Sequence, residues 1–147
     1  MKTANTILSH QTKELFDFID VTEEVKKFVS ESSIKNGLVN VQIMHTSAAL
    51  LFNENEPLLL EDIKANLEKI APKDAGYGHD DFDRRIVNVC EDECVNGHSH
   101  CKAIRLPSTI TLNLIEGKLQ LGQWQRIMLA ELDSSRPRKI QVQVIGE

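Results

Sequence analysis

The segment from Asn96 to Cys101 holds the densest set of chemically active side chains, because His98, His100 and Cys101 fall within four residues. The whole chain has only five histidines and three cysteines. Imidazole nitrogen and thiolate sulfur are the usual protein ligands of zinc and similar ions. If the segment is extended, side chains two residues apart point to the same side, so His98 and His100 would face one site. The pattern therefore predicts a site for a metal ion or a charged substrate.

A second candidate is the tripeptide His45-Thr46-Ser47, which follows an alternating apolar segment at residues 39–43. The alternation is typical of a half-buried strand, so His45 would lie where that strand gives way to a loop. The hydroxyl groups of Thr46 and Ser47 could bind phosphate oxygens, as loop amides also do. A single histidine after a strand is also commonly a structural residue, and the tripeptide alone does not separate the two roles.

The third candidate is the loop from Tyr77 to Asp83, where His79 is followed directly by Asp80 and Asp81. A carboxylate next to an imidazole can bind the same metal ion, can fix the imidazole tautomer, or can act as a general base. A solvent-exposed acidic loop would have the same composition. The residue types therefore leave both interpretations open.

Two arrangements of these side chains could hold a metal ion. The local spacing Cys-x3-Cys-x3-His at positions 90 to 98 would give a small zinc site, but structural zinc sites usually join two ligand pairs across a longer loop. We favour a site built from distant segments, in which His45, His79 and His100 supply three neutral nitrogens. Three imidazoles leave an open position for water or substrate, which is the coordination of a catalytic site.

The elements that must position these residues follow from the apolar pattern. Leu15 to Phe18 suggests an N-terminal strand, and Asp20 with Glu23 resembles the capping box that starts a helix. This helix is predicted to run through Ser32 and to end at Asn36-Gly37, because glycine favours the left-handed conformation of a helix stop. The half-buried strand before His45 comes next.

A second helix, a long loop and several strands complete the chain. An apolar segment at 48–52 precedes Pro57, which suits the first turn of a helix that ends before Pro72. Residues 73–97 lose the apolar pattern and are rich in Asp and Glu, which marks a surface loop of the kind that often carries function. Further strands are predicted at 109–115, 118–121, 124–132 and 139–145, with a tight turn at Glu116-Gly117. We expect an α+β fold in one domain spanning 1–147, with a mostly antiparallel sheet or sandwich flanked by two main helices.

Composition excludes several classes of protein. With 41% hydrophobic and 27% charged residues over 147 residues, the chain is typical of one globular domain. The net charge of -5 argues against general binding of duplex nucleic acid and leaves small molecules and proteins as expected partners. There is neither a signal-peptide pattern nor an apolar run of about 18 residues that could cross a membrane, so we expect a cytoplasmic protein. Cys90, Cys94 and Cys101 are then expected to be free thiols or metal ligands, and a Cys90–Cys94 disulfide is the alternative for a hyperthermophile.

The sequence also resembles a known family. The order and spacing of short motifs over nearly the whole chain are similar to those of the YjbQ-like family. The matching motifs are His45-Thr46-Ser47-Ala48, Asn53-Glu54-Asn55, Tyr77-x-His79-Asp80, His100-x-Lys102-Ala103, Gly117-Lys118-Leu119-x-Leu121-Gly122-x-Trp124-Gln125 and Arg136-Pro137-Arg138. Each motif is short, but together their order and spacing are specific.

The resemblance implies an α+β homotrimer with a histidine-lined site near subunit contacts, suited to a divalent metal ion such as zinc or magnesium. It also implies a thiamine-phosphate synthase activity, which joins hydroxymethylpyrimidine diphosphate to a thiazole phosphate and releases pyrophosphate. The implied metal ligands are His45, His79 and His100. The implied catalytic residues are Asp80, Lys102 and Arg136, and the implied substrate-binding residues are Thr46, Ser47, Asn53, Asn55 and Arg138. The alternative is a non-catalytic homotrimer that binds a metal ion or a phosphorylated ligand.

Overall fold

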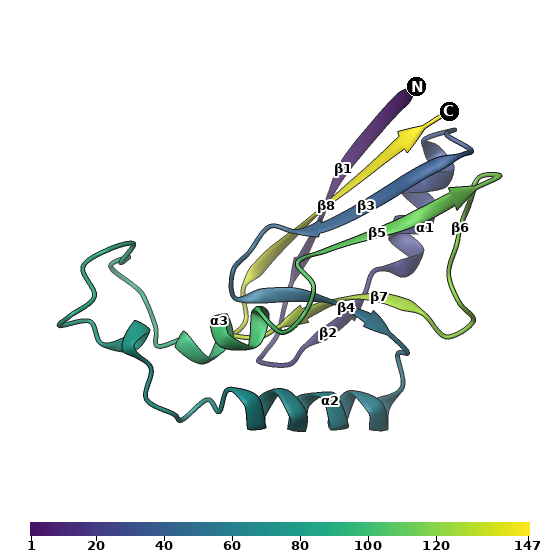
Figure 1. The fold of residues 1–147 in the computed structure, drawn as a ribbon. Helices are drawn as coiled ribbons and strands as arrows, with labels where there is room; N and C mark the ends of the chain where they lie inside the picture. Colours follow the sequence, from purple (N-terminus) through teal and green to yellow (C-terminus); the bar gives the residue numbers. More distant parts are fainter.

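Two antiparallel β-sheets form the framework of the protein. A computed structural model describes residues 1–147 (Figure 1). One sheet has five strands in the order β1-β8-β3-β5-β6, and the other has three in the order β2-β7-β4. The strands are β1 (Lys2–Gln11), β2 (Phe18–Asp20), β3 (Gly37–Ile43), β4 (Ala48–Asn53), β5 (Thr109–Ile115), β6 (Lys118–Leu119), β7 (Arg126–Glu131) and β8 (Pro137–Gly146). The helices are α1 (Thr22–Glu31), α2 (Pro57–Ile70), α3 (Gly97–Ala103) and the short 3-10 helix η1 (Gly78–Asp80). The predicted α+β class is confirmed.

Most of the core lies between the two sheets and α1. The alternate β3 residues Val39, Val41 and Ile43 are buried, as the period of two requires for a strand with one face inward. They belong to one cluster with Val25 and Val29 of α1 and with residues of β4, β7 and β8. A second cluster joins the other face of the three-stranded sheet to α2 and to the segment around α3. The three-stranded sheet is therefore covered on both faces, and burial of these apolar groups supplies the main stabilising term.

The N-terminal strand and the end of the first helix differ from the sequence-based prediction. The strand predicted at residues 15–18 is wrong in its position, because β1 and β2 lie on either side of a turn in which Phe16 has a φ of 63°. α1 begins at Thr22, close to the predicted start, and ends at Glu31. The left-handed residue after it is Ser33, with a φ of 59°, rather than the predicted Asn36-Gly37.

The remaining elements follow the predicted order, with one exception. β3 ends just before His45, α2 has Pro57 at its start, and both residues of the Glu116-Gly117 turn have positive φ values of 52° and 75°. The exception is the segment of His98 and His100, which forms α3 and is not extended. Residues two apart on a helix are separated by about 200° around its axis. The two rings therefore do not face one site.

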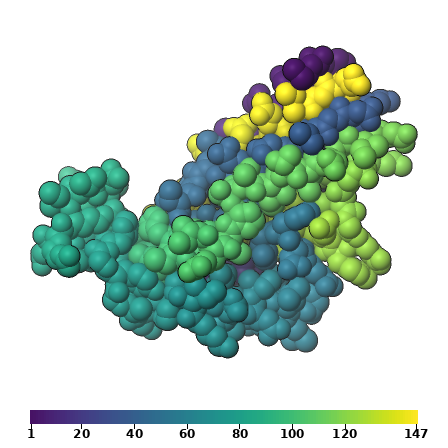
Figure 2. All heavy atoms as spheres, viewed as in Figure 1, coloured from purple at the N-terminus to yellow at the C-terminus, as the bar shows by residue number.

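The residues between α2 and α3 form the predicted surface excursion. They stand away from the two sheets as a lobe in Figure 2, with η1 packed against α3. No helix in the chain combines the length and the apolar character needed to cross a lipid bilayer. The lobe is held against the rest of the protein by α3, which contacts both η1 and β4.

Candidate functional site

The loop between β3 and β4 joins the two sheets and carries His45, Thr46 and Ser47. The backbone N–H of Lys139 donates a hydrogen bond to His45 Nε2 at 2.8 Å. Burial lowers the pKa of His45, and the neighbouring Arg138 guanidinium lowers it further. The neutral imidazole is therefore favoured, and because Nε2 accepts a bond, the ring carries its proton on Nδ1.

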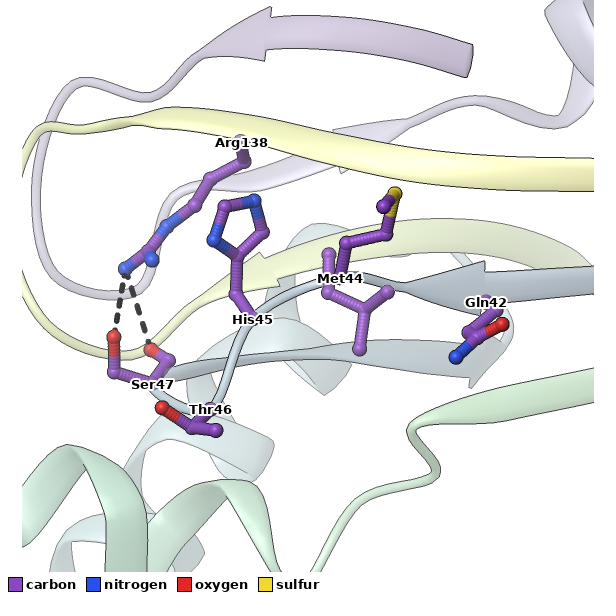
Figure 3. A pocket seen from close by; sticks show the side chains of 7 residues that line it. Gln42, Met44, His45, Thr46, Ser47 and Arg138 are labelled. Carbon is purple, nitrogen blue, oxygen red and sulfur yellow. Dashed lines mark hydrogen bonds between the residues drawn. The ribbon is translucent and has the colours of Figure 1, made fainter. Parts of the chain in front are cut away.

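Two open pockets flank this loop and share His45 and Thr46. The first, of about 450 Å³, is lined by the loop together with Arg138 (Figure 3). The second, of about 490 Å³, is lined by both shared residues and by a wall formed from α3, including His100, and the segment that follows it. A guanidinium and hydroxyl groups make the first pocket suitable for an anion. Apolar side chains beside two imidazoles make the second suitable for an aromatic ring.

His100 forms a pair with His79 of η1. The ring centroids lie 4.6 Å apart and the planes are tilted by 64°. Burial lowers the pKa of His100, and His79 lowers it further, whereas a hydrogen bond with the Thr46 backbone acts in the opposite direction. His100 is therefore favoured in the neutral form, which is the form of imidazole that binds metal ions.

This pair could supply two ligands of a metal site, whereas the third predicted ligand, His45, lines the second pocket with His100 but is not grouped with the pair. His79 Nε2 is buried and has no hydrogen-bond partner, although Glu93 Oε1 lies 3.9 Å away, and a buried polar atom without a hydrogen bond is uncommon. His45 does not join the pair, because its Nε2 already accepts the bond from Lys139. No group of three or more His, Cys, Asp or Glu side chains in the chain is placed to hold a metal ion. The three-histidine arrangement is thus not assembled within one chain.

Asp80 joins η1 to α3. Its Oδ1 accepts hydrogen bonds from the backbone N–H groups of Asn96 and Gly97, both at 2.9 Å. A carboxylate at this end of a helix satisfies N–H groups that have no partner within the helix and is favoured by the helix dipole. Residue 97 must be glycine for this contact, because a Cβ there would lie 2.5 Å from Tyr77 Cβ. The structure thus gives Asp80 a direct part in placing His79 beside His100.

Lys102 is fully buried and its ammonium group is used inside the fold. Nζ donates to the carbonyl oxygen of Ala71 at 2.6 Å and lies 3.1 Å from both His98 Nδ1 and Glu68 Oε2. Burial lowers the pKa of His98, and Lys102 lowers it further, so the neutral ring can accept from the ammonium. These contacts tie α3 to the end of α2. Lys102 lines neither pocket beside the His45 loop.

Arg138 and Ser47 belong to a buried network centred on Glu131. Glu131 is fully buried at the end of β7 and accepts from Arg138 Nε and from Thr12 Oγ1, both at 2.7 Å. It also accepts from the backbone N–H groups of the next two residues. Arg138 Nη2 donates to Ser47 Oγ at 3.1 Å. Sequence reasoning missed Glu131, although a lone carboxylate in the apolar run 127–132 was the available signal.

The Arg136 side chain has partners outside this network, although its backbone N–H donates to Thr12 Oγ1 at 2.9 Å. Its Nη2 donates to Cys94 Sγ at 3.0 Å, and its Nε lies 2.8 Å from Asp133 Oδ2. The three cysteines are free thiols, and Cys90 and Cys94 are exposed whereas His98 is buried. The local zinc site considered for positions 90 to 98 is therefore absent, because the helix turns His98 toward the interior.

Asn53 and Asn55 lie at the opposite end of the three-stranded sheet from the His45 loop. In the antiparallel pairing of β4 with β7, Asn53 is the partner of Arg126, and Ala48, at the end of β4 next to the His45 loop, is the partner of Glu131. Six strand residues separate the two ends by about 17 Å. Asn55 Nδ2 donates to Asp20 Oδ2 at 3.2 Å. Within one chain these asparagines do not meet the histidines.

Comparisons with known proteins point to one family. A family model described as "UPF0047 protein YjbQ-like" matches residues 6–147. A UPF0047 protein of Methanothermobacter thermautotrophicus is 39% identical over 137 residues, which cover 93% of this chain and 88% of that protein. The crystal structure of a YbjQ-like protein of unknown function from Sulfolobus solfataricus P2 has a TM-score of 0.88 at 32% identity, covering 99% of both chains. A yjbq/upf0047 family protein of Clostridium acetobutylicum has a TM-score of 0.82 at 35% identity, covering 95% of this chain and 99% of that chain.

Proposed function

The chain belongs to the YjbQ-like family, UPF0047, and on that premise we propose that it is a thiamine-phosphate synthase. The proposed reaction joins hydroxymethylpyrimidine diphosphate to a thiazole phosphate and releases pyrophosphate. Both substrates combine an aromatic ring with phosphate groups. The observation that carries the proposal is the pair of pockets that share His45 and Thr46, one suited to an anion and the other with an apolar wall.

The residues of these pockets would act mainly by positioning. Departure of pyrophosphate requires cationic groups and correct orientation more than a protein nucleophile. Arg138 would bind phosphate oxygens in the first pocket, with the hydroxyl groups of Thr46 and Ser47 as further donors. A substrate ring would lie against the apolar wall of the second pocket, next to His100. The bond between the pyrimidine substrate and its leaving pyrophosphate would then lie beside the shared loop, where the two pockets meet.

We further propose that His79 and His100 hold a divalent metal ion, zinc or magnesium. The unpartnered His79 Nε2 and the neutral form of His100 support this assignment, and imidazole ligands favour zinc, since magnesium binds mainly oxygen. The remaining ligands would come from substrate phosphates or from a neighbouring subunit of a homotrimer. A bound divalent ion would offset the negative charge on the departing pyrophosphate.

A non-catalytic homotrimer that binds a metal ion or a phosphorylated ligand is the second candidate. The placement of Asp80 and Lys102 favours it, because both belong to the implied catalytic set and yet use their polar atoms to hold α3 in place. In this case the two pockets would bind their ligand without turnover. Light scattering on the purified protein would determine whether three chains associate.

The deciding experiment combines product formation with metal content. Purified protein is incubated with the two precursors and zinc or magnesium, thiamine phosphate is measured by chromatography, and metal ions per chain are measured by elemental analysis. We expect product from the wild type and loss of both product and metal in His79→Ala and His100→Ala. His10→Ala is the matched control, because His10 lies on β1 beside Glu24 and lines neither pocket. Metal bound without product formation would support the non-catalytic metal-binding protein. Absence of both metal and product in the wild type would refute the synthase and the metal site, and would leave only binding of a phosphorylated ligand.

A further inference from the structure

Arg138 has one nitrogen that the fold does not use. Its Nε and Nη2 donate to Glu131 and Ser47, whereas Nη1 donates to no acceptor in the chain. The residue is only 4% exposed, yet it lines the first pocket. Two hydrogen bonds to the Glu131 carboxylate fix the plane of the guanidinium. The unused nitrogen therefore has a fixed direction.

Three backbone N–H groups of the same pocket are also unused. Those of His45, Thr46 and Ser47 have no acceptor within the chain. The two residues before them are paired, since the N–H groups of Ile43 and Met44 donate to backbone carbonyls at 2.9 and 3.1 Å. The break in pairing thus begins at His45, within the lining of the first pocket. His45 is half-buried and Thr46 is exposed, so these N–H groups are open to the pocket. Consecutive loop N–H groups without a partner in the chain can bind an anion in place of water.

We propose that these three N–H groups and Arg138 Nη1 form a phosphoryl-binding subsite, and that Glu131 is the positioning residue that orients Arg138 toward it. The inference rests on the proposed function and deepens it by assigning the two pockets. The diphosphate of the pyrimidine substrate would occupy this subsite, with its ring in the second pocket against the wall that includes Ile104.

The network around Glu131 also predicts how anion binding at this subsite responds to salt. Glu131 offsets the charge of Arg138, so the bound anion is held mainly by oriented donors and less by net positive charge. Interactions of buried groups are screened by salt much less than those of exposed charges. Binding of a diphosphate at this subsite is therefore expected to weaken only slightly when salt is raised.

The test is calorimetric titration of the protein with inorganic pyrophosphate. We expect binding by the wild type and at least a tenfold loss of affinity in Arg138→Gln. That variant leaves Glu131 buried without its partner, which is strongly destabilising. The double variant Glu131→Gln with Arg138→Met removes both buried charges, while the glutamine oxygen can still accept from the backbone N–H groups of Leu132 and Asp133, and it should also lose pyrophosphate binding. Arg84→Gln is the charge-matched control, because Arg84 is 82% exposed on the lobe.

The positioning role of Glu131 has its own readout. Glu131→Gln keeps the shape of the side chain and removes its charge, so Arg138 loses its fixed orientation. We expect the KM for the pyrimidine diphosphate to rise while the KM for the thiazole phosphate stays unchanged, a split that general destabilisation would not produce. Unchanged pyrophosphate affinity in a folded double variant, or an equal loss in Arg84→Gln, would overturn the inference. Pyrophosphate binding that depends on Arg138 without formation of thiamine phosphate would support the subsite and reject the synthase.

Discussion

Replacement of Lys102 by methionine distinguishes a structural lysine from a catalytic one. Lys102 is fully buried, and methionine fills a similar volume, so the change removes the ammonium group with little loss of packing. The largest consequence is at Ala71, which is 3% exposed and whose carbonyl oxygen accepts from Nζ at 2.6 Å. A buried acceptor left without a donor costs about 1–3 kcal/mol.

Three smaller effects modify this value. The buried His98 Nδ1 also loses the ammonium group as a hydrogen-bond donor. The pair with Glu68 adds little, because the Glu68 side chain is 40% exposed and solvent screens the interaction. Removing a buried ammonium group also relieves its desolvation, which acts in the stabilising direction. We expect a net loss of about 2 kcal/mol in the free energy of unfolding. For a domain of this size the melting temperature would fall by about 4–8 °C.

The assay is thermal unfolding followed by circular dichroism, with synthase activity measured on the same preparation at a temperature where the variant is folded. Lys69→Met is the control, since Lys69 is exposed in the last turn of α2 and its replacement should leave the melting temperature unchanged. A Lys102→Met protein that melts like the wild type but forms no product would refute the structural role. That outcome would mean that the ammonium group reaches substrate in a conformation different from this one.

Three further predictions concern α3 and the histidines. Gly97→Ala should destabilise the protein by about 1–3 kcal/mol in urea unfolding, because its Cβ would meet Tyr77, whereas Gly76→Ala should be tolerated, since no atom lies within 4 Å of a Cβ there. Asp80→Ala should cost about 0.5–2 kcal/mol as a lost helix cap and should lower the metal content, and retention of full metal content would contradict its placing of His79. The folded protein should lose stability as the pH falls below about 6.5. The fold lowers the pKa values of three histidines, so below this pH these histidines bind more protons in the unfolded chain than in the folded one. Urea unfolding at pH 7.5 and 5.5 tests this, and equal stability at both would contradict the lowered pKa values of His45, His98 and His100.

The elements next to the His45 loop were predictable because their signals are local. Alternation at residues 39–43 follows from one buried and one exposed face, and it placed His45 correctly at the end of β3. Pro57 marks the start of α2 because it needs no hydrogen-bond donor in the first helical turn. The positive φ values at Glu116-Gly117 belong to a tight turn between paired strands. Each signal is contained within a few neighbouring residues.

The elements that were missed depend on distant partners. α3 begins with N–H groups that donate to Asp80, sixteen residues before Asn96, so the local sequence around His98 does not reveal the helix. β1 pairs only with β8 at the edge of its sheet, and its inward residues are only partly buried. An edge strand of this kind lacks the strong apolar alternation on which strand prediction depends. Consequently the local sequence predicts an extended His-x-His segment and gives no signal for β1.

The same dependence decides which charged residues can serve the site. Arg138, Arg136 and Lys102 look equally suitable for phosphate in the sequence, but the fold gives each a different partner: Glu131 for Arg138, Cys94 with Asp133 for Arg136, and a backbone carbonyl for Lys102.

Of these three cations, only Arg138 lines a pocket beside the His45 loop. Glu131 ends β7 in the three-stranded sheet, Arg138 belongs to β8 in the five-stranded sheet, and Ser47 precedes β4. The hydrogen bonds among these three residues therefore connect the two sheets, and the geometry of the pocket depends on how the sheets pack against each other. A core substitution that shifts one sheet against the other should weaken pyrophosphate binding before it unfolds the protein.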